Sequence, residues 1–491
     1  MGRIFKNILT IAVGAYVFFF AYEWWHPMLD ELLVASKTYQ VPDAGIHFFA
    51  DTSYIDTKNN LRVLDQHIWG QVGKIIANAK HTITLDMFLY NDFQGPHPET
   101  ARKLSQELTE MLVNKKTTDK HIIIALITDP INTVYGGVTS PYFIKLMLSG
   151  IPVITTDLSI LPDSNVPWSA AWYPFMSWMG NSTTGGWLAH PFDATGDKVT
   201  LRSWMALLNM KANHRKLLVA DQPIIGGKNV GKQKMVTFVT SSNPHDGSSA
   251  NGNVALQVDD KIWREALSSE HIVARLSSAG LPNYDAASTL DADGNVSVTL
   301  LHEAFIKERV LERIEHAKQG DQINLVMFYL SERDIVNALA DASNRGVNIR
   351  IILDPNNEAF GFQKNGIPNQ PVARELLQRS NDSIQVRWCA TLGEQCHAKL
   401  MYGASATNSY MFIGSANFTR RNIDGFNLES DLYVESTGAR FSAWNDANSY
   451  FEKMWSNTGG RYTDDYILHR DDTFWKASLA RLMEFSGMSS F

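Results

Sequence analysis

The 491-residue sequence has few charges for its length and no long basic segment. Lys and Arg together number 44 against 51 Asp and Glu, which gives a net charge of −7. Without a cationic field, the chain as a whole is not suited to holding extended nucleic acid through its phosphates. Apolar residues make up 44% and charged residues 19%, values that exclude a disordered chain and a bundle of membrane helices. Any anionic substrate must therefore bind to a local group of positively charged residues.

Cysteine is also scarce, because only Cys389 and Cys396 occur. Two cysteines fall short of the four ligands of a structural zinc site, and no other residues obviously complete one. Outside the cytosol, this closely spaced pair predicts a disulfide that closes a short loop just before His397. In the cytosol the same pair would be two reduced thiols.

Long apolar runs are missing too, with one exception over residues 7–22. As a helix this run would span roughly 24 Å, and flanking aromatic residues would extend it towards the ~30 Å of a bilayer core. Arg3 and Lys6 precede the run, so the positive-inside rule predicts a single-pass anchor with the remaining chain in a bacterial periplasm or a lumen. We interpret residues 1–27 as this anchor because no small-x-small cleavage site is evident; the alternative is a cleaved signal peptide.

What the sequence does contain is an internal repeat. The pattern Asp-Pro-x-Asn-x-x-aromatic-Gly follows an apolar strand at residues 129–136 and again at residues 354–361. Ser-Ser-Asn at residues 241–243 corresponds to Ser-Ala-Asn at residues 415–417. Helical segments with one apolar face lie between the predicted strands. Matching order and spacing indicate a duplication.

The repeat predicts an α/β fold of two similar α/β sandwich halves, each with a mixed sheet flanked by helices. We expect a pseudo-two-fold to relate them and a transmembrane segment to precede them. Residues 45–276 form the predicted first half, residues 298–491 the second half with a C-terminal helix, and the Gly-, Pro- and Asp-rich residues 277–297 a linker. A duplicated enzyme of this kind tends to build one site at the shared interface, so we expect a monomer.

Each half carries His-x-Lys ahead of an apolar strand, at His214 and Lys216 and at His397 and Lys399. On a strand, residues two apart point to the same face, so each pair reaches one cleft. Two imidazoles and two ammonium groups suit a phosphodiester. One histidine attacks phosphorus and the other protonates the leaving oxygen, while Lys and Asn hold the non-bridging oxygens. Structural histidines with solvated lysines are the alternative.

These motifs resemble the phospholipase D superfamily, whose signature is His-x-Lys-x4-Asp followed by Gly/Ser-x-Asn, present twice per active site. The resemblance covers about residues 45–455 and implies phosphatidyl or phosphodiester transfer through a covalent phosphohistidine, with no metal and no cofactor. The resemblance to this family implies that His214 is the nucleophile and that His397 is the acid/base. Carried over by position, the implied catalytic residues are His214, Lys216, Asp221, Asn243, His397, Lys399, Asn417 and Glu429, the last orienting a histidine.

Two positions depart from the family pattern. Ala404 occupies the place of the motif Asp in the second half, and Ala255 stands where gapless alignment of the repeats would match Glu429. Because the motif Asp is largely a supporting residue in this family, its loss in one half indicates divergence more than inactivity. The two histidines are therefore expected to be unequally oriented.

An aromatic insert of about 50 residues, at residues 158–210, lies directly before His214 in the first half only. Its Trp residues, Trp172 and Trp178 among them, predict an interfacial lip that admits a lipid headgroup, because Trp favours the headgroup zone of a bilayer. The alternative is a local core under a long loop. Near the C-terminus, an apolar stripe that includes Trp475 and Leu482 is expected to pack against the domain.

The sequence therefore predicts a membrane-anchored phospholipase D-like enzyme that acts on glycerophospholipids. With water as acceptor it would release phosphatidic acid, and with glycerol or a second lipid it would be a phosphatidyltransferase of the cardiolipin synthase type. Two alternatives stay open: a single-strand nuclease of the same superfamily, and an inactive scaffold suggested by Ala404.

Overall fold

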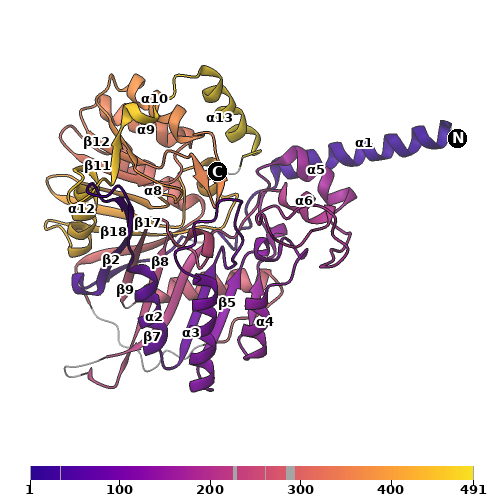
Figure 1. The fold of residues 1–491 in the computed structure, drawn as a ribbon, viewed down its shortest axis with the longest axis horizontal. Coiled ribbons are helices and arrows are strands. Elements are labelled where there is room, and N and C mark those ends of the chain that lie inside the picture. The colour runs from indigo at the N-terminus through magenta and orange to yellow at the C-terminus, as the bar shows by residue number, and fades with distance from the viewer. Residues whose placement is uncertain (1, 34, 225–228, 260, 284–292, 490–491) are drawn as a thin grey trace.

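The computed structural model describes residues 2–33, 35–224, 229–259, 261–283 and 293–489. Two mixed sheets with helices on their outer faces form the body, and one helix projects from it (Figure 1). This is the predicted fold class. Part of the predicted linker, residues 284–292, lies outside the described residues.

The sheet of the first half has eight strands. Its middle strands are antiparallel, whereas β4, β5 and β6 run parallel to one another. In sheet order the strands are β3 (Arg62–Asp65), β2 (Ile46–Ile55), β9 (Asn253–Asp259), β8 (Gln233–Thr240), β7 (Lys216–Pro223), β4 (Thr82–Met87), β5 (Ile123–Thr128) and β6 (Val153–Thr155).

The sheet of the second half has nine strands and repeats this order from β10 to β15, which confirms the duplication. In sheet order they are β1 (Thr38–Val41), β10 (Val296–His302), β18 (Ser430–Thr437), β17 (Asn408–Gly414), β16 (Lys399–Ala404), β11 (Gln322–Met327), β12 (Asn348–Leu353), β15 (Gln385–Cys389) and β19 (Thr463–Asp465). Strand β1 lies N-terminal to the first half in the sequence, yet it pairs with β10 and forms an edge strand of the second sheet. Strand β10 begins at Val296, inside the predicted linker.

Helices cover both sheets because each presents one apolar face. Leu104, Leu108 and Leu112 of α3 are buried against the first sheet, and Ile306 and Val310 of α8 against the second. The covering helices are α2 (Ile68–Asn78), α3 (Leu104–Thr118), α4 (Pro141–Leu148), α8 (Ala304–Glu315), α9 (Arg333–Asn344) and α10 (Asn369–Arg379). Helices α7 (Trp263–Leu276) and α12 (Ser442–Trp455) contribute to the core cluster between the sheets, and α13 (Phe474–Ser486) packs on α10.

The inner faces of the two sheets pack on each other. Leu217 and Val219 of β7 contribute to one core cluster together with Leu400 and Leu432 of the second half, whereas Leu218 of β7 belongs to the cluster under the helices. This alternation is the period of a strand with both faces buried. The strands that follow the two His-x-Lys motifs, β7 and β16, are thus held centrally in their sheets.

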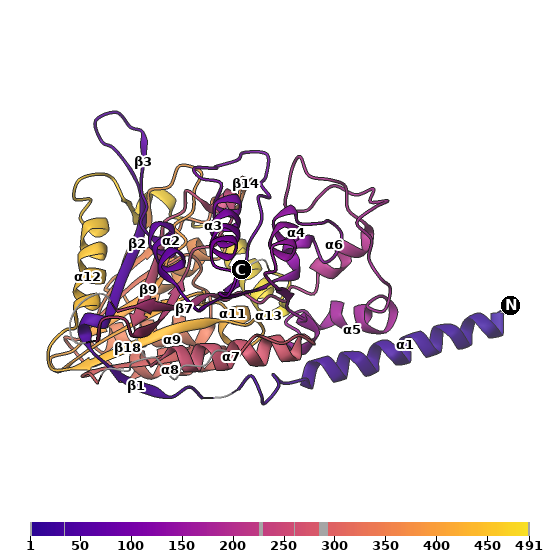
Figure 2. The same ribbon diagram turned by 90° about the horizontal axis from the view of Figure 1, so that it is seen from below.

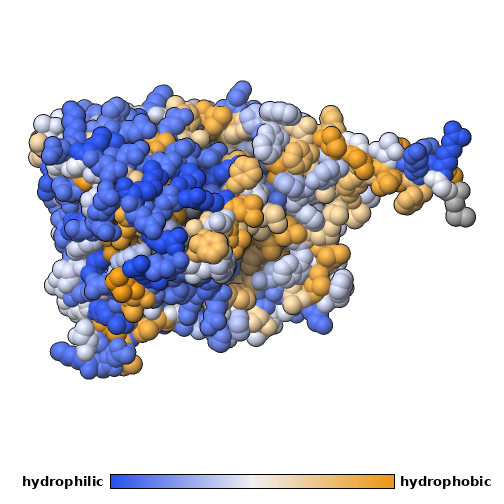
Figure 3. Space-filling model, turned by 90° about the horizontal axis from the view of Figure 1, so that it is seen from above, coloured by the Kyte–Doolittle hydropathy of each residue, from blue (hydrophilic) through white to orange (hydrophobic). Residues whose placement is uncertain are grey.

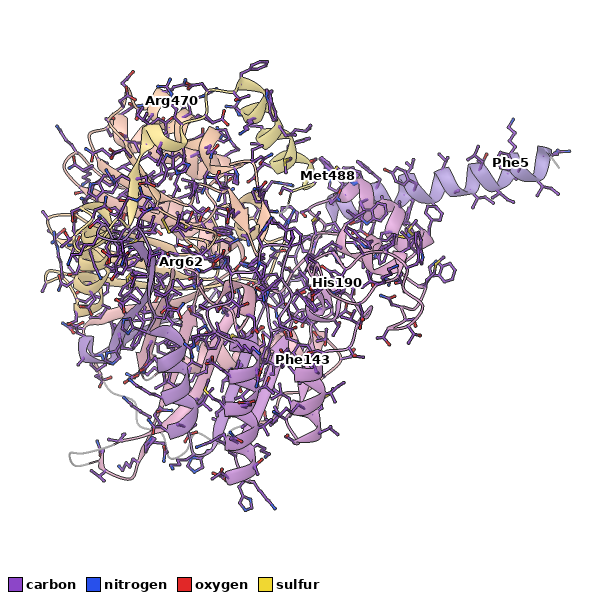
Figure 4. All side chains as sticks on the ribbon, in the orientation of Figure 1. Phe5, Arg62, Phe143, His190, Arg470 and Met488 are labelled. Carbon is purple, nitrogen blue, oxygen red and sulfur yellow. A yellow bond between two sulfur atoms is a disulfide. The ribbon has the colours of Figure 1, made fainter. Side chains whose placement is uncertain are left out.

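Helix α1 (Gly2–Trp25) projects from the body, with Phe5 far out along it (Figure 4). By length and composition it is apolar enough to cross a membrane. Its C-terminal part lies along the insert, whose helices are α5 (Val166–Phe175) and α6 (Leu201–Leu207) (Figure 2). The hydroxyl of Tyr16 donates to the carbonyl of Pro167 at 3.3 Å, so the helix is docked on the insert.

Candidate active site

The two motif histidines lie where the halves meet. The backbone N–H of His214 donates to the carbonyl of Leu428 in the second half at 2.9 Å, and that of His397 donates to the carbonyl of Gly252 in the first half at 2.7 Å. Each histidine is therefore fixed by the main chain of the opposite half.

The Asp-Pro-x-Asn repeat places a carboxylate behind each histidine. Asp129 accepts the backbone N–H of Asn213 at 2.7 Å, and Asp354 accepts the backbone N–H of Cys396 at 2.7 Å. Cys389 and Cys396 are joined by a disulfide, which closes the loop before His397. The repeat thus holds the residue that precedes each histidine.

Glu429 is the partner of His214. Its carboxylate lies 2.8 Å from Nδ1 of the imidazole, and it also accepts from the hydroxyl of Ser415 and the amide of Asn422. Glu429 and Asn422 both meet the imidazole at Nδ1, and His214 lines the cavity described below. Nε2 is the atom through which this histidine can act.

Asn253 is the partner of His397, and it corrects the expectation for Ala255. Its amide oxygen lies 3.1 Å from Nδ1 of His397 and accepts from Ser241 at 3.1 Å, as Glu429 does from Ser415. The backbone N–H of Ser241 donates to Val254, whereas that of Ser415 donates to Ser430. Asn253 is therefore the counterpart of Glu429. The segment from Ser241 to Asn253 is two residues shorter than the segment from Ser415 to Glu429.

The two motif lysines lie below the histidines and are fully buried. Nζ of Lys216 donates to the carbonyl of His214 at 2.6 Å, and Nζ of Lys399 lies 2.9 Å from Nε2 of His397. Phe88 and Phe328 each pack one ring against a histidine and near a lysine, 5.0 Å and 5.2 Å from the two Nζ atoms. The pseudo-symmetry therefore extends to the aromatic neighbours.

Burial dominates the electrostatics of this group. It lowers the pKa of Lys216 to about 7 and, with the charge of Lys216, lowers the pKa of Lys399 well below its usual range. Burial and the lysine charges also lower the pKa values of His214 and His397 well below the usual range. Burial raises the pKa of Glu429 to about 7. The charges in the site are thus poorly solvated, which suits a site that awaits an anion.

The histidines open into a cavity of about 530 Å³ between the halves and the insert. Asn243 and Asn417 of the Ser-x-Asn elements line it, and the amide oxygen of Asn417 has no hydrogen-bond partner among the described residues. The other polar lining residues are Asn91, Lys211, His245, Gln363, Lys364, Arg421, Asn422 and Asn427. Among the described residues that line the cavity, none is Asp or Glu.

Asp221 is not part of this group, which corrects its assignment as a catalytic residue. Its carboxylate accepts the backbone N–H groups of Lys80, His81 and Thr82, at the end of β7 remote from His214. In the second half, Asp321 accepts the backbone N–H of Lys318 at 2.9 Å. The turn is therefore capped from within, and Ala404 needs no carboxylate.

The insert and the C-terminal helix each have both buried and exposed apolar side chains. Trp172 is only 6% exposed, under the guanidinium of Arg202, so its assignment to a lipid contact is wrong. Trp178 is 71% exposed and can meet a bilayer. On α13, Leu479 packs against the domain, whereas Trp475 is 49% exposed, which corrects the expected stripe.

Sequence reasoning missed Asn253, Asn422 and Arg421. Asn253 is displaced by the two-residue gap between the repeats. Arg421 and Asn422 both lie in the short helix α11 (Arg420–Ile423), whose four residues are too few to show a periodic pattern. Among the described residues, no group of three or more His, Cys, Asp or Glu is placed to hold a metal ion.

Comparisons with known proteins found similarities in sequence and in fold. Residues 310–455 match the family model described as cardiolipin synthase, PLD-like domain. The structure is similar to that of phosphatidylserine synthase from Haemophilus influenzae, with a TM-score of 0.56 and 10% identity over 93% of this chain and 98% of that one. It also matches a phospholipase D family member, Nuc from Salmonella typhimurium, with a TM-score of 0.26 and 20% identity over 34% of this chain and 97% of that one. No curated protein sequence matches the chain.

Proposed function

Because the chain belongs to the phospholipase D superfamily, we propose that it hydrolyses or transfers the phosphatidyl groups of glycerophospholipids. The observation that carries the proposal is the convergence of His214, His397, Asn243 and Asn417 on one cavity whose described lining residues include no Asp or Glu. Such a cavity suits a phosphodiester, because donors converge where charge develops and no carboxylate repels it.

The unequal partners of the two histidines support His214 as the nucleophile. Glu429 holds Nδ1–H, so that the lone pair of Nε2 faces the cavity, and its carboxylate stabilises the positive charge that develops on the ring. Nε2 of His214 would bond to phosphorus as the headgroup oxygen leaves with a proton from His397. The phosphohistidine bond would then break as an acceptor oxygen bonds to phosphorus and its proton returns to His397.

Binding of substrate would raise the pKa of His397, so that the imidazole takes up a proton from solvent. In the free protein the nearby ammonium groups lower the pKa of His397, and Lys399 lies beside its Nε2. A bound phosphodiester anion would attract both lysines and offset their charge, which raises the pKa of His397. The protonated share of His397 would thus be larger with substrate bound than in the free protein.

Three features support action at a membrane. Helix α1 would anchor the chain, and the exposed Trp178 and Trp187 of the insert would lie in the headgroup zone. Figure 3 shows hydrophobic residues concentrated on the side of the molecule that carries α1. The disulfide supports an extracytoplasmic catalytic part.

A buried polar cluster also joins the anchor to the cavity. Glu23 of α1 is 5% exposed and bonds to Asp163, which pairs with Lys211 at 2.9 Å. Lys211 lines the cavity three residues before His214. The orientation of the anchor and the wall of the cavity are therefore coupled.

The test uses the full-length protein in detergent with labelled mixed phospholipids, with labelled single-stranded DNA, and with chelator. We expect release of phosphatidic acid, or its transfer to added glycerol, and loss of both in His214→Ala and His397→Ala. His316→Ala changes an exposed histidine outside the cavity and should retain activity. Trimming of DNA with no lipid product would refute the proposal, and inactivity on both substrates would favour a scaffold.

A further inference from the structure

The middle residue of the first His-x-Lys motif, Arg215, has no part in the proposed reaction. Unlike His214, it does not line the cavity, and it is only 1% exposed. The equivalent residue of the second motif is Ala398, where the main chain is arranged in the same way. The carbonyl of Arg215 accepts the N–H of Phe88 at 3.1 Å, and that of Ala398 accepts the N–H of Phe328 at 3.0 Å. The motif therefore folds without a guanidinium, so the buried charge of Arg215 needs another explanation.

Arg215 joins the two halves through buried carboxylates. Nη1 donates to Glu270 of α7 in the first half at 3.0 Å and to the hydroxyl of Ser269 at 2.8 Å. Nη2 donates to Glu303 of the second half at 2.7 Å. Both carboxylates are fully buried, and buried charges must be paired because water cannot solvate them. The guanidinium therefore determines where the carboxylate of Glu303 lies.

Glu303 in turn holds the partner of His214. The oxygen that accepts from Arg215, Oε1, also accepts the backbone N–H of Glu429 at 3.2 Å, and the carboxylate of Glu429 lies 2.8 Å from Nδ1 of His214. Glu303 has a φ of 47°, which is strained for a residue with a side chain and persists only where surrounding contacts hold it. These contacts form a closed ring, because Arg215 follows His214 in the sequence and returns to it through Glu303 and Glu429.

We propose that Arg215 and Glu303 are positioning residues for the nucleophile: through the backbone N–H of Glu429 they fix its carboxylate on Nδ1 of His214 while Nε2 attacks phosphorus. The inference rests on the proposed function, in which His214 is the nucleophile. Misplacement of a reacting group by about 1 Å can cost about 100-fold in rate, so a fixed carboxylate matters to this step. The second motif cannot build the same support, because Ala398 has no polar side chain.

The experiment is a double-mutant cycle on kcat, with the full-length protein in detergent and a short-chain phospholipid. Arg215→Gln should lower kcat about 10- to 100-fold with little change in KM, because Arg215 does not line the cavity. Glu429→Gln should lower kcat further, since the imidazole loses its charged partner. If Arg215 acts through Glu429, the double variant is no slower than Glu429→Gln alone. Losses that multiply would mean that Arg215 supports only the fold, which overturns the inference.

Glu303 supplies a second test, which leaves Arg215 paired with Glu270. Glu303→Ala removes the acceptor of the Glu429 N–H and should lower kcat as much as Arg215→Gln does. Glu303→Gln keeps an oxygen at this place and should recover most of the loss. Both variants retain a Cβ, so the backbone strain at position 303 is the same in the two. Equal kcat values in these two variants would overturn the inference, and this comparison decides it even if Arg215→Gln does not fold.

Arg313→Gln is the matched control. Arg313 of α8 pairs with Glu435 at 2.7 Å, near the end of β18 remote from Glu429, and it does not line the cavity. The substitution should lower the unfolding temperature, change kcat only a few-fold and multiply with the effect of Glu429→Gln. A loss in Arg313→Gln that equals the loss in Arg215→Gln would overturn the inference.

The same measurements separate failure of this inference from failure of the proposed function. A wild type that turns over no phospholipid would overturn both together. An active wild type in which the losses of Arg215→Gln and Glu429→Gln multiply would overturn the inference alone.

Discussion

Replacing Asn253 by Asp tests the assignment of the two histidines. The amide oxygen of Asn253 lies 3.1 Å from Nδ1 of His397, so the substitution puts a carboxylate where the other histidine has Glu429. An opposite charge at this range raises an imidazole pKa by about 1–3 units. That corresponds to ~1.4–4 kcal/mol in favour of the imidazolium.

The assay is the pH dependence of kcat/KM on a short-chain lipid, which reports the free enzyme. If His397 is the general acid, it must be protonated, so kcat/KM falls as pH rises through its pKa. Raising that pKa should move the alkaline limb of the profile upward by about 1–3 pH units. The acidic limb reports deprotonation of the nucleophile His214 and should stay in place.

Each other outcome is informative. Movement of the acidic limb alone would mean that His397 is the nucleophile, which refutes our assignment. No movement of either limb would mean that the residue at 253 does not govern His397. Asn253 also donates to the carbonyl of Asn251 at 3.1 Å, so thermal unfolding must show that the loss of this bond, about 1 kcal/mol, leaves the fold intact.

Two further predictions concern residues whose roles the structure reassigns. Asp221→Ala should lower the unfolding temperature, because three backbone N–H groups lose a charged acceptor at about 1–3 kcal/mol for a buried group, while kcat/KM of the folded protein changes only a few-fold. A large loss of activity with an unchanged unfolding temperature would contradict this. Trp178→Ser with Trp187→Ser should reduce activity on vesicles far more than on a soluble short-chain lipid, since both rings are exposed. Trp172→Ser, as the contrast, should mainly destabilise the fold, by about 3–5 kcal/mol, and equal losses on both substrates in the exposed pair would count against an interfacial role.

The repeated motifs predicted the fold because strand order follows from them. Once residues 129–136 and 354–361 are aligned, the strands before and after them must occupy equivalent places in two sheets. Strand β1 could not be predicted in this way. Its four residues, Thr38–Val41, have no partner nearby in the sequence and pair with Val296 to Thr299 across the linker. Short edge strands of this kind depend on tertiary contacts more than on their own pattern.

The site was predictable where function demands a residue type at a fixed spacing. His214, Lys216, His397 and Lys399 converge as their motifs indicate. Asn253 was missed because gapless alignment is insensitive to a short deletion in a loop. Arg421, in a four-residue helix, and Lys364, in a loop, were missed because neither segment has a sequence period that shows which of its residues reach the cavity.

The two departures from the duplicated pattern differ in consequence because they lie at opposite ends of their strands. Ala404 is at the remote end of β16, where Asp321 already caps the neighbouring turn. Asn253 instead touches a histidine that belongs to the other half. Since each half supplies the partner of the opposite histidine, a change on β9 of the first half alters the chemistry of the second motif. Divergence of the residue that hydrogen-bonds each histidine from the opposite half can assign different roles to two histidines that began as equivalents. It can do so without disturbing either sheet.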